Sequence, residues 1–233
     1  MQTKVHFGII GAMQPEIDSL VSRLKDPKMK IISGQLFYYG KLEKKSVVIA
    51  KCGIGKVFAA MATEAMILNF SPKLIINTGV AGGLLPDLAQ GDIVVASELC
   101  QHDMDTTAIG DPKGLISGTG KVFFGADERA RRILCTIGGT KEYAIRQGVI
   151  ASGDQFISSK EEKERIGREF SAAACEMEGG AIAQVAFVNN IPFCVIRAIS
   201  DGADEGANLS YDRFLPIAAA HSAELTLELI KKY

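Results

Sequence analysis

Short apolar runs alternate with segments of helical periodicity along almost the whole chain, and this alternation constrains the fold most strongly. The run Val5–Ile10, closed by Gly11, predicts a buried first strand. Residues 14–24, with apolar side chains at helical spacing, and Lys56–Phe70, which ends before a proline, predict helices. Alternation of this kind predicts one α/β domain over residues 1–233, with a mixed central sheet and helices on both faces.

The remaining expected elements continue this pattern. Further strands are expected at Met29–Tyr39, Ser46–Cys52, Leu74–Asn77, Asp92–His102, Ala144–Ser152 and Pro192–Ile199. Further helices are expected at Ala126–Ile137, Ser159–Phe170 with Ser159 as N-cap, Glu178–Asn189 and residues 212–232. The glycines predict turns at Gly40-Lys41 and at residues 78–83, and a long loop over residues 105–125.

Composition and charge exclude several classes of protein. The 233-residue chain has a net charge of −1 and no basic patch, so neither nucleic acid nor a membrane surface is expected as a partner. No apolar run reaches the roughly 18 residues of a membrane span, and the N-terminus shows no signal-peptide pattern. The five cysteines are widely spaced and do not cluster with the three histidines, so we expect reduced thiols and no metal site. These features favour a cytoplasmic protein.

Four of the expected strands end in a short polar or glycine-rich element. These ends are Gly11-Ala12-Met13, Thr78-Gly79, Ser152-Gly153-Asp154 and Ser200-Asp201. In open α/β sheets, ligands bind outside the carboxyl ends of the strands. The four ends therefore predict one binding site, and the glycines of the 78–83 turn would let a flat ligand approach the backbone.

Acidic side chains near these ends are the first candidates for chemistry. Glu16 lies one helical turn after the first strand, Glu176 and Glu178 lie two residues apart, and Asp201 follows a buried strand. The residues alone leave two interpretations open, because a carboxylate at a helix start can stabilise the helix or take part in catalysis. Burial would raise the pKa of Asp201. Arg197, in the middle of the same strand, must find an anion or water.

Six short segments spread over the whole chain form a more specific pattern. They are Gly8–Met13, Gly53–Val57, Ile75–Gly79, Ser152–Ile157, Glu176–Glu178 and Arg197–Asp201. In this order and spacing they resemble the 5′-methylthioadenosine/S-adenosylhomocysteine nucleosidase family. The resemblance implies a nucleoside-phosphorylase-like fold, a single-domain three-layer α/β/α sandwich whose mixed, distorted sheet approaches a barrel. It also implies a homodimer.

The resemblance implies catalytic roles for four residues. Glu16 matches the carboxylate that activates the attacking water. Asp201, held by Ser200, matches the acid that protonates adenine at N7. Arg197 matches a residue that organises the water and Glu16. Every one of these roles is an expectation carried by the matching motif.

The same resemblance implies a set of substrate-binding residues. Glu178 matches the ligand of the ribose 2′- and 3′-hydroxyls, with Met177 packed on the sugar. Phe156 matches a ring stacked on adenine, whose edge the backbone of Ile157 reads. Further positions expected around the substrate are Met13, Ile54, Val80, Ala81, Gly82, Glu176 and Tyr211. Ile109 lies on a loop that in the family covers the partner subunit's pocket.

These residue types suit hydrolysis of an N-glycosidic bond. Breaking that bond places positive charge on the ribose and negative charge on the purine, so an acid at N7 contributes typically about 10²–10⁴-fold, and a carboxylate beside the sugar assists. Water activated by Glu16 then adds to C1′. Asp201 must hold a proton while Glu16 stays ionised, which calls for pKa values set apart by their surroundings. The expected substrates are 5′-methylthioadenosine, S-adenosylhomocysteine and 5′-deoxyadenosine, and 6-amino-6-deoxyfutalosine stays open.

Three positions depart from the family's pattern. Val80 stands where serine is common, so we expect Glu16 and Arg197 to orient the water without a hydroxyl from that position. Tyr211 and Ile109 stand where phenylalanine is common, and the loop over residues 110–120 also differs. The departures leave the chemistry unchanged but leave the preferred 5′ substituent open.

Three other functions remain to be compared with hydrolysis. A purine nucleoside phosphorylase of the same fold needs cations around phosphate, whereas this chain has Glu16 near the first strand end and Asn77 before the Thr78-Gly79 turn. A nucleoside-binding sensor would not need the three carboxylates together. An oxidoreductase would need a dinucleotide fingerprint, which Gly53-Ile54-Gly55-Lys56 lacks, so no cofactor is expected.

Overall fold

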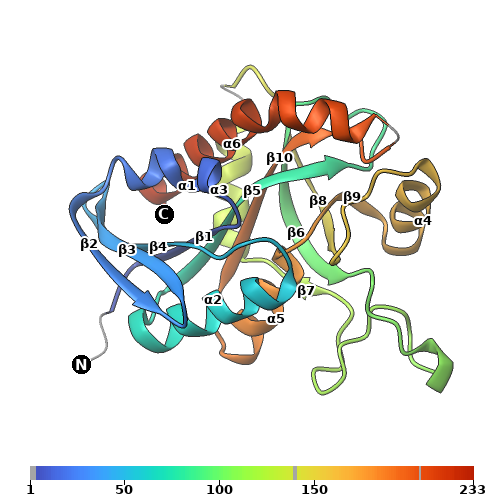
Figure 1. Ribbon diagram of the computed structural model, residues 1–233, viewed down its shortest axis with the longest axis horizontal. Coiled ribbons are helices and arrows are strands. Elements are labelled where there is room, and N and C mark those ends of the chain that lie inside the picture. The colour runs from blue at the N-terminus through green and yellow to red at the C-terminus, as the bar shows by residue number, and fades with distance from the viewer. Residues whose placement is uncertain (1–3, 139–140, 205) are drawn as a thin grey trace.

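The computed structural model describes residues 4–138, 141–204 and 206–233, and in them strands and helices alternate as predicted (Figure 1). The strands are β1 (Phe7–Gly11), β2 (Lys25–Ile32), β3 (Gln35–Leu42), β4 (Lys45–Lys51), β5 (Leu74–Gly83), β6 (Ile93–Gln101), β7 (Phe124–Gly125), β8 (Ile145–Ser152), β9 (Ala172–Glu176) and β10 (Phe193–Asp201). The helices are α1 (Gln14–Val21), α2 (Lys56–Phe70), the short 3-10 helix η1 (Thr107–Ile109), α3 (Glu128–Gly138), α4 (Lys160–Phe170), α5 (Gly179–Val188) and α6 (Ala207–Lys232).

Part of the sheet closes on itself. Strand β10 pairs with both β5 and β6, β6 pairs with β8, β8 with β9, and β9 returns to β5. Strands β1, β4, β3 and β2 extend the sheet outward from β5. Parallel pairs such as β5–β10 and antiparallel pairs such as β5–β9 occur in the same sheet. The predicted mixed, distorted sheet that approaches a barrel is confirmed.

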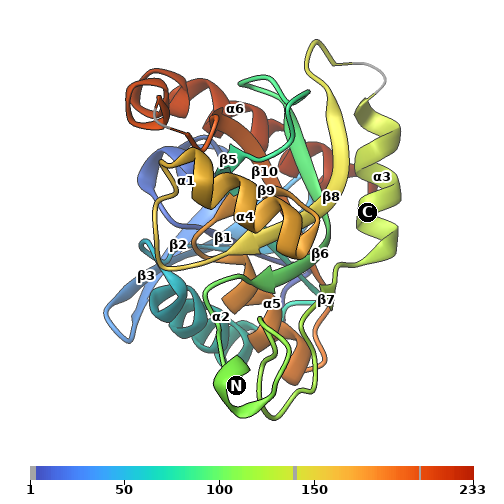
Figure 2. The ribbon, with the colours of Figure 1, turned by 90° about the vertical axis from the view of Figure 1, so that its right-hand side faces the viewer.

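Helices cover both faces of this sheet. Helices α1, α3 and α6 lie on one face, where Ile17, Leu134 and Leu229 belong to one apolar core. Helices α2 and α5 lie together on the other face, where Met66 and Ile182 belong to a second core (Figure 1). Helix α4 lies outside strands β8 and β9 (Figure 2). The three-layer arrangement follows from the apolar stripes that the helices turn toward the sheet.

The N-terminal hairpin differs from the prediction. The expected strand Met29–Tyr39 is wrong, because the chain turns at Ser33 and Gly34, both with positive φ, and forms β2 and β3. The expected turn at Gly40-Lys41 is also wrong, since both residues belong to β3 and pair with β4. Apolar residues on both sides of the Ser-Gly turn made the two strands look continuous. Gly40 lies where a Cβ would meet the backbone of Lys25, which gives this glycine a packing reason inside a strand.

Three other boundaries also shift. Residues 78–83 are the second half of β5 and not a turn, because they pair with β10 and β9. Helix α6 begins at Ala207, before the expected residue 212. The 105–125 segment is a long projecting loop as expected, although it contains η1 and β7 (Figure 2). The Ser159 N-cap is confirmed by a hydrogen bond that its Oγ accepts from the Glu162 N–H at 3.2 Å.

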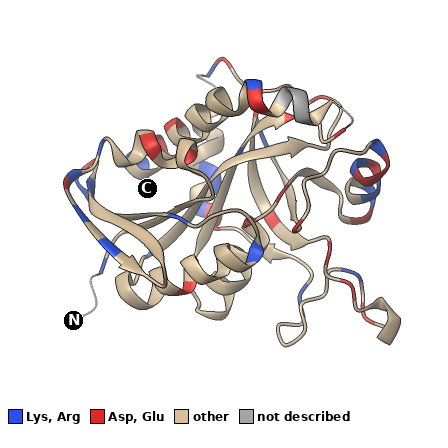
Figure 3. Cartoon of the chain, in the orientation of Figure 1, with Lys and Arg blue, Asp and Glu red and all other residues tan. Residues whose placement is uncertain are grey.

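Charged residues are distributed unevenly over the surface. Lysines gather on the β2–β3 hairpin, α4 carries both signs, and α2 is largely uncharged after its first residue (Figure 3). In the described part of the chain, no helix combines the length and apolar character needed to cross a membrane. No group of three or more His, Cys, Asp or Glu residues within the described ranges could hold a metal ion.

Candidate active site

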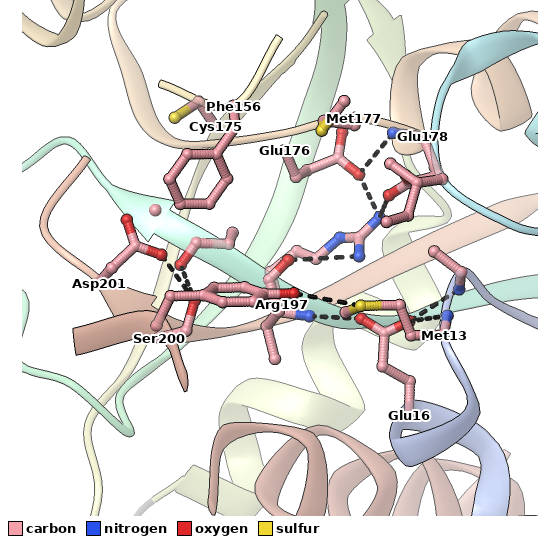
Figure 4. Close-up of a pocket in the computed structure, with 16 residues that line it drawn as sticks. Met13, Glu16, Phe156, Cys175, Glu176, Met177, Glu178, Arg197, Ser200 and Asp201 are labelled. Atoms are coloured by element: carbon pink, nitrogen blue, oxygen red, sulfur yellow. Dashed lines mark hydrogen bonds and ion pairs between the residues drawn. The ribbon is translucent and has the colours of Figure 1, made fainter. Parts of the chain in front are cut away.

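One cavity of about 360 Å³ lies at the carboxyl ends of β1, β5, β9 and β10. It is lined by Ala12, Met13, Glu16, Ile54, Val80, Ala81, Gly82, Phe156, Cys175, Glu176, Met177, Glu178, Arg197, Ser200, Asp201 and Tyr211 (Figure 4). Ile157 lines a small adjoining cavity that shares Phe156 and Asp201 with the first. The predicted ends of β1 and β10 and the second half of β5 therefore meet in one site. The predicted end Ser152-Gly153-Asp154 of β8 does not line the cavity, and residues at the end of β9 do so instead. Ile109 lies elsewhere, on η1, and is 80% exposed.

Glu16 is held by backbone donors from two strand ends. Pro15 opens α1 next to it, and Glu16 Oε2 accepts hydrogen bonds from the N–H groups of Ala12 at 2.7 Å and Met13 at 2.9 Å. Glu16 Oε1 accepts one from the Val80 N–H at 3.1 Å. Burial raises the pKa of Glu16, while the charge of Arg197 and the three backbone donors act to lower it. Glu16 therefore has a fixed orientation toward the cavity.

Gly79 makes room for this arrangement. A Cβ at this position would collide with Arg197 Nη1 and lie 2.5 Å from Glu16 Oε1. The sequence had suggested that glycine here allows close approach of a flat ligand. The structure shows that the missing Cβ of Gly79 leaves room for the side chains of Arg197 and Glu16 beside the backbone.

Arg197 lies fully buried in β10 among carboxylates. Its Nη2 donates to Glu176 Oε2, to Asn77 Oδ1 at 2.6 Å and to Glu178 Oε2 at 3.4 Å. Its Nη1 donates to the Val80 carbonyl oxygen at 3.4 Å, and its influence on Glu16 is through charge. The expectation that Arg197 organises the water and Glu16 stays a prediction. The buried guanidinium has found anions, as its position in the strand required.

Glu176 and Glu178 differ in how their oxygens are used. Glu176 accepts hydrogen bonds from Ser152 Oγ, from the N–H groups of Glu178 and Gly179, and from Arg197. Glu178 accepts only from the Gly55 N–H at 2.9 Å and from Arg197 among the described contacts. Burial is the main cause that raises the pKa of Glu178 to about 7, with Arg197 opposing and Glu176 adding to the rise. Glu176 anchors Arg197 and the start of α5, and Glu178 keeps acceptor capacity for a ligand.

Asp201 lies at the opposite end of the cavity. Its Oδ2 accepts a hydrogen bond from Ser200 Oγ at 2.8 Å, and its Oδ1 accepts one from the Ala203 N–H at 2.9 Å. Burial raises the pKa of Asp201 and outweighs these two donors. Because burial also raises the pKa of Glu16, burial by itself does not set the pKa values of Glu16 and Asp201 apart. They differ in their donors and in the presence of Arg197 beside Glu16.

Two aromatic rings form the wall near Asp201. Phe156 is 40% exposed, and its ring meets Tyr211 edge to face at a centroid distance of 5.5 Å. The Tyr211 hydroxyl donates to Met13 Sδ at 3.1 Å, so Tyr211 connects the two ends of the cavity. An exposed ring above a buried acid offers a face on which a flat heterocycle can stack.

Comparisons with known proteins agree with this geometry. The family model described as "Phosphorylase superfamily" matches residues 6–231. A 5′-methylthioadenosine/S-adenosylhomocysteine nucleosidase of Haemophilus influenzae (strain PittEE) is 39% identical over 97% of this chain and 98% of its own length. The chain belongs to this nucleosidase family. The resemblance seen in the sequence and the enzyme class that it implies are therefore confirmed.

Solved structures of nucleosidases have the same fold. The Neisseria meningitidis 5′-methylthioadenosine/S-adenosylhomocysteine nucleosidase in complex with methylthio-immucillin-A is similar, with a TM-score of 0.94, 39% identity and coverage of 98% of this chain and 99% of that chain. The futalosine hydrolase of Helicobacter pylori strain 26695 has a TM-score of 0.94 and 37% identity, with 98% of each chain covered. The predicted fold class is confirmed.

Sequence reasoning on this nucleosidase gave no individual role to several residues around the cavity, although Ala12 and Ser152 belong to the predicted strand ends. Ala12 and Cys175 line it, while Asn77 and Ser152 lie behind it and hold Arg197 and Glu176. The sequence did carry a signal for Asn77 and Ser152, because polar residues at the ends of buried strands need partners. Nothing in the spacing of Cys175 sets it apart from the apolar residues before it.

Proposed function

We propose that this protein hydrolyses the N-glycosidic bond of 5′-substituted adenosines and releases adenine. The observation that carries the proposal is that Glu16, Glu178 and Asp201, from three distant parts of the chain, line one cavity. The curated relative named above is a 5′-methylthioadenosine/S-adenosylhomocysteine nucleosidase, which supports these two nucleosides as substrates. We include 5′-deoxyadenosine as a further substrate of the same class.

Asp201 is the general acid of the proposed reaction. With its pKa raised by burial, Asp201 keeps a proton to a higher pH than an ordinary aspartic acid and donates it to N7 of the departing adenine. Ser200 holds the carboxyl group through its 2.8 Å hydrogen bond. Phe156 stacks on the base, and the backbone of Ile157 reads its edge. Protonation neutralises the negative charge that develops on the purine.

Glu178 and Glu16 act on the sugar and on water. Glu178 accepts hydrogen bonds from the ribose hydroxyls, with Met177 against the sugar, and its charge stabilises the cationic ribosyl group. Glu16 takes a proton from the water that adds to C1′. The Val80 N–H holds Glu16 in place at 3.1 Å. The Val80 side chain has no hydroxyl, so orientation of the water falls to Glu16 and Arg197.

Water suits this cavity better than phosphate does. Among the described residues that line it, Arg197 is the single cation, and three glutamates surround it. A phosphate nucleophile needs several free cationic or neutral donors, and Glu16 would repel it. The phosphorylase alternative is therefore less supported.

The 5′ substituent would lie among Met13, Ile54 and Tyr211. The solved futalosine hydrolase of Helicobacter pylori, with its TM-score of 0.94, supports 6-amino-6-deoxyfutalosine as an additional substrate to test. Relative turnover of this compound, 5′-methylthioadenosine, S-adenosylhomocysteine and 5′-deoxyadenosine would rank the 5′ groups.

We also propose a cytoplasmic homodimer that acts in methionine salvage. Met66 is buried in the core, but the outer side of α2 and the turn before it expose apolar residues, which are Ile54, Val57, Phe58, Met61 and Leu68. Large exposed apolar patches are typical of interfaces. In the proposed dimer, Ile109 on the projecting loop covers the partner subunit's cavity, and its 80% exposure in the single chain supports this role. Sedimentation equilibrium should give twice the chain mass, and Met61→Lys should lower it.

Adenine release tests the proposed reaction. Purified protein should release adenine from 5′-methylthioadenosine in phosphate-free buffer, and added phosphate should not increase the rate. Formation of a sugar 1-phosphate that depends on added phosphate would support the phosphorylase instead. Binding of the nucleoside without turnover would support a sensor.

A further inference from the structure

Helix α2 begins without a capping side chain of its own. Its N-cap residue is Gly55, with φ of 98°, so the first N–H groups must find acceptors elsewhere. The Lys56 N–H donates to Asp154 Oδ1 at 2.7 Å, and the Gly55 N–H donates to Glu178 Oε1 at 2.9 Å. Two carboxylates from distant segments therefore cap this helix, where its dipole favours negative charge.

A third carboxylate closes this arrangement. Asp103 Oδ1 pairs with Lys56 Nζ at 2.6 Å, and Asp103 Oδ2 accepts a hydrogen bond from the Asp154 N–H at 2.9 Å. Lys56, Asp103 and Asp154 thus form a ring of contacts, here called the 56–103–154 cluster. The paired side chains of Lys56 and Asp103 are only 18% and 31% exposed, so their attraction is screened less than that of a surface pair. Partial burial acts to raise the pKa of Asp103, but hydrogen bonds from Lys56 and Asp154 bring it below its usual value.

The 56–103–154 cluster joins two walls of the cavity. Ile54 lies two residues before Lys56 and Phe156 two residues after Asp154, and both line the cavity. None of the three cluster residues lines it. Asp103 also stands at the root of the projecting loop. Glu16 and Asp201, which transfer protons in the proposed reaction, are positioned by other contacts. Glu178 contacts this region through the Gly55 backbone N–H and not through a side chain of the cluster. The cluster can therefore affect binding separately from proton transfer.

We infer that Lys56, Asp103 and Asp154 are positioning residues that hold the Ile54 wall and the Phe156 wall at the separation a purine nucleoside needs. The inference rests on the proposed function. Breaking the cluster lets the two walls move apart, which weakens contacts made equally in the ground state and in the transition state. Loss of such contacts raises KM and leaves kcat nearly unchanged.

A double-mutant cycle tests this role in the full-length protein. Asp103→Asn and Lys56→Met should each raise KM for 5′-methylthioadenosine about tenfold, as expected for the loss of one charged hydrogen bond, with a smaller change in kcat. The double variant should be no worse than the poorer single variant, because both remove the same contact. Lys56→Arg should keep KM within about threefold of the unmodified protein, since it retains the charge.

The control is Glu128→Gln on α3, because the Glu128 side chain is 66% exposed, pairs with Arg132 and belongs to another surface. Melting temperatures are measured for every variant, and Asp154→Asn replaces any variant that unfolds below the assay temperature and should raise KM in the same way. Unchanged KM values, kcat losses equal to the KM increases, or additive effects would overturn the inference. Absence of adenine release by the unmodified protein would refute the proposed function instead.

Discussion

At one end of the cavity, backbone N–H groups hold Glu16 and Glu178, and Arg197 pairs with Glu178. At the other end, Asp201 lies near the partly exposed ring of Phe156 (Figure 4). The first end concentrates charge, with Arg197 among three buried glutamates. The second holds one acid with a raised pKa and an aromatic face. The first suits a sugar that becomes cationic, and the second suits a base that must accept a proton.

Removal of the acid at the base end should have the largest effect. Asp201→Asn keeps the shape and loses the proton, so kcat should fall by about 10²–10⁴-fold. In the unmodified protein, activity should fall as the pH rises through the raised pKa of Asp201, because the ionised form cannot donate. Asp87→Asn, whose side chain is 61% exposed in a pair with Arg146, is the matched control. A pH–rate profile of adenine release checks both, and near-normal turnover of Asp201→Asn would refute the acid role.

At the sugar end, Glu178→Gln should lower kcat by about 10²–10³-fold through lost charge stabilisation.

The same substitution should also change how stability depends on pH. The pKa of Glu178 is raised from 4.5 to about 7 in the folded protein. The contribution of Glu178 to the free energy of unfolding is therefore complete below pH 4.5 and is lost as the pH rises through 7. Between about pH 5 and pH 8, the unmodified protein should therefore lose stability relative to Glu178→Gln. Urea titrations across this range measure the difference, and parallel curves would contradict the assigned shift.

The close packing at the sugar end gives a further prediction. Gly79→Ala should lower the free energy of unfolding by about 1–3 kcal/mol, because the new Cβ would meet Arg197 and Glu16. Gly125→Ala is the control, since a Cβ there has no neighbour within 4 Å. Chemical denaturation of both variants gives the comparison. Equal free energies of unfolding for Gly79→Ala and Gly125→Ala would mean that the side chains of Arg197 and Glu16 can move aside at no cost.

The smallest effect is expected where the two ends meet. Tyr211→Phe removes a hydroxyl whose partner is the weak acceptor Met13 Sδ, at 3.1 Å. The kcat/KM for 5′-methylthioadenosine should change by less than about threefold, because a bond to a thioether contributes little. Steady-state kinetics on several 5′-substituted adenosines would show whether the hydroxyl matters more for polar substituents. A loss as large as that of Asp201→Asn would contradict the division between the two ends.

Local sequence patterns predicted those parts of the fold that depend on local physics. The bounds of α2 agree with the prediction because its helical residues end before Pro72. The Ser33-Gly34 turn was missed because apolar residues continue on both sides of it. Residues 78–83 form strand only through pairing with β9 and β10, which no local pattern reveals.

The site shows the same limit. Short motifs placed Glu16, Glu178 and Asp201 at strand ends, and those ends converge as α/β topology requires. Partners of these groups come from far along the chain, as Val80 does for Glu16 and Gly55 does for Glu178. Such contacts are set by packing between segments, so they could be found only in the folded molecule.

The identity of the nucleophile is the most direct test of water chemistry in this cavity. The protein is incubated with 5′-methylthioadenosine in ¹⁸O-labelled water, with phosphate present, and the sugar product is analysed by mass spectrometry. The predicted result is one ¹⁸O atom at C1 of a free 5-methylthioribose. A sugar 1-phosphate that carries unlabelled phosphate oxygen at C1 would contradict the account.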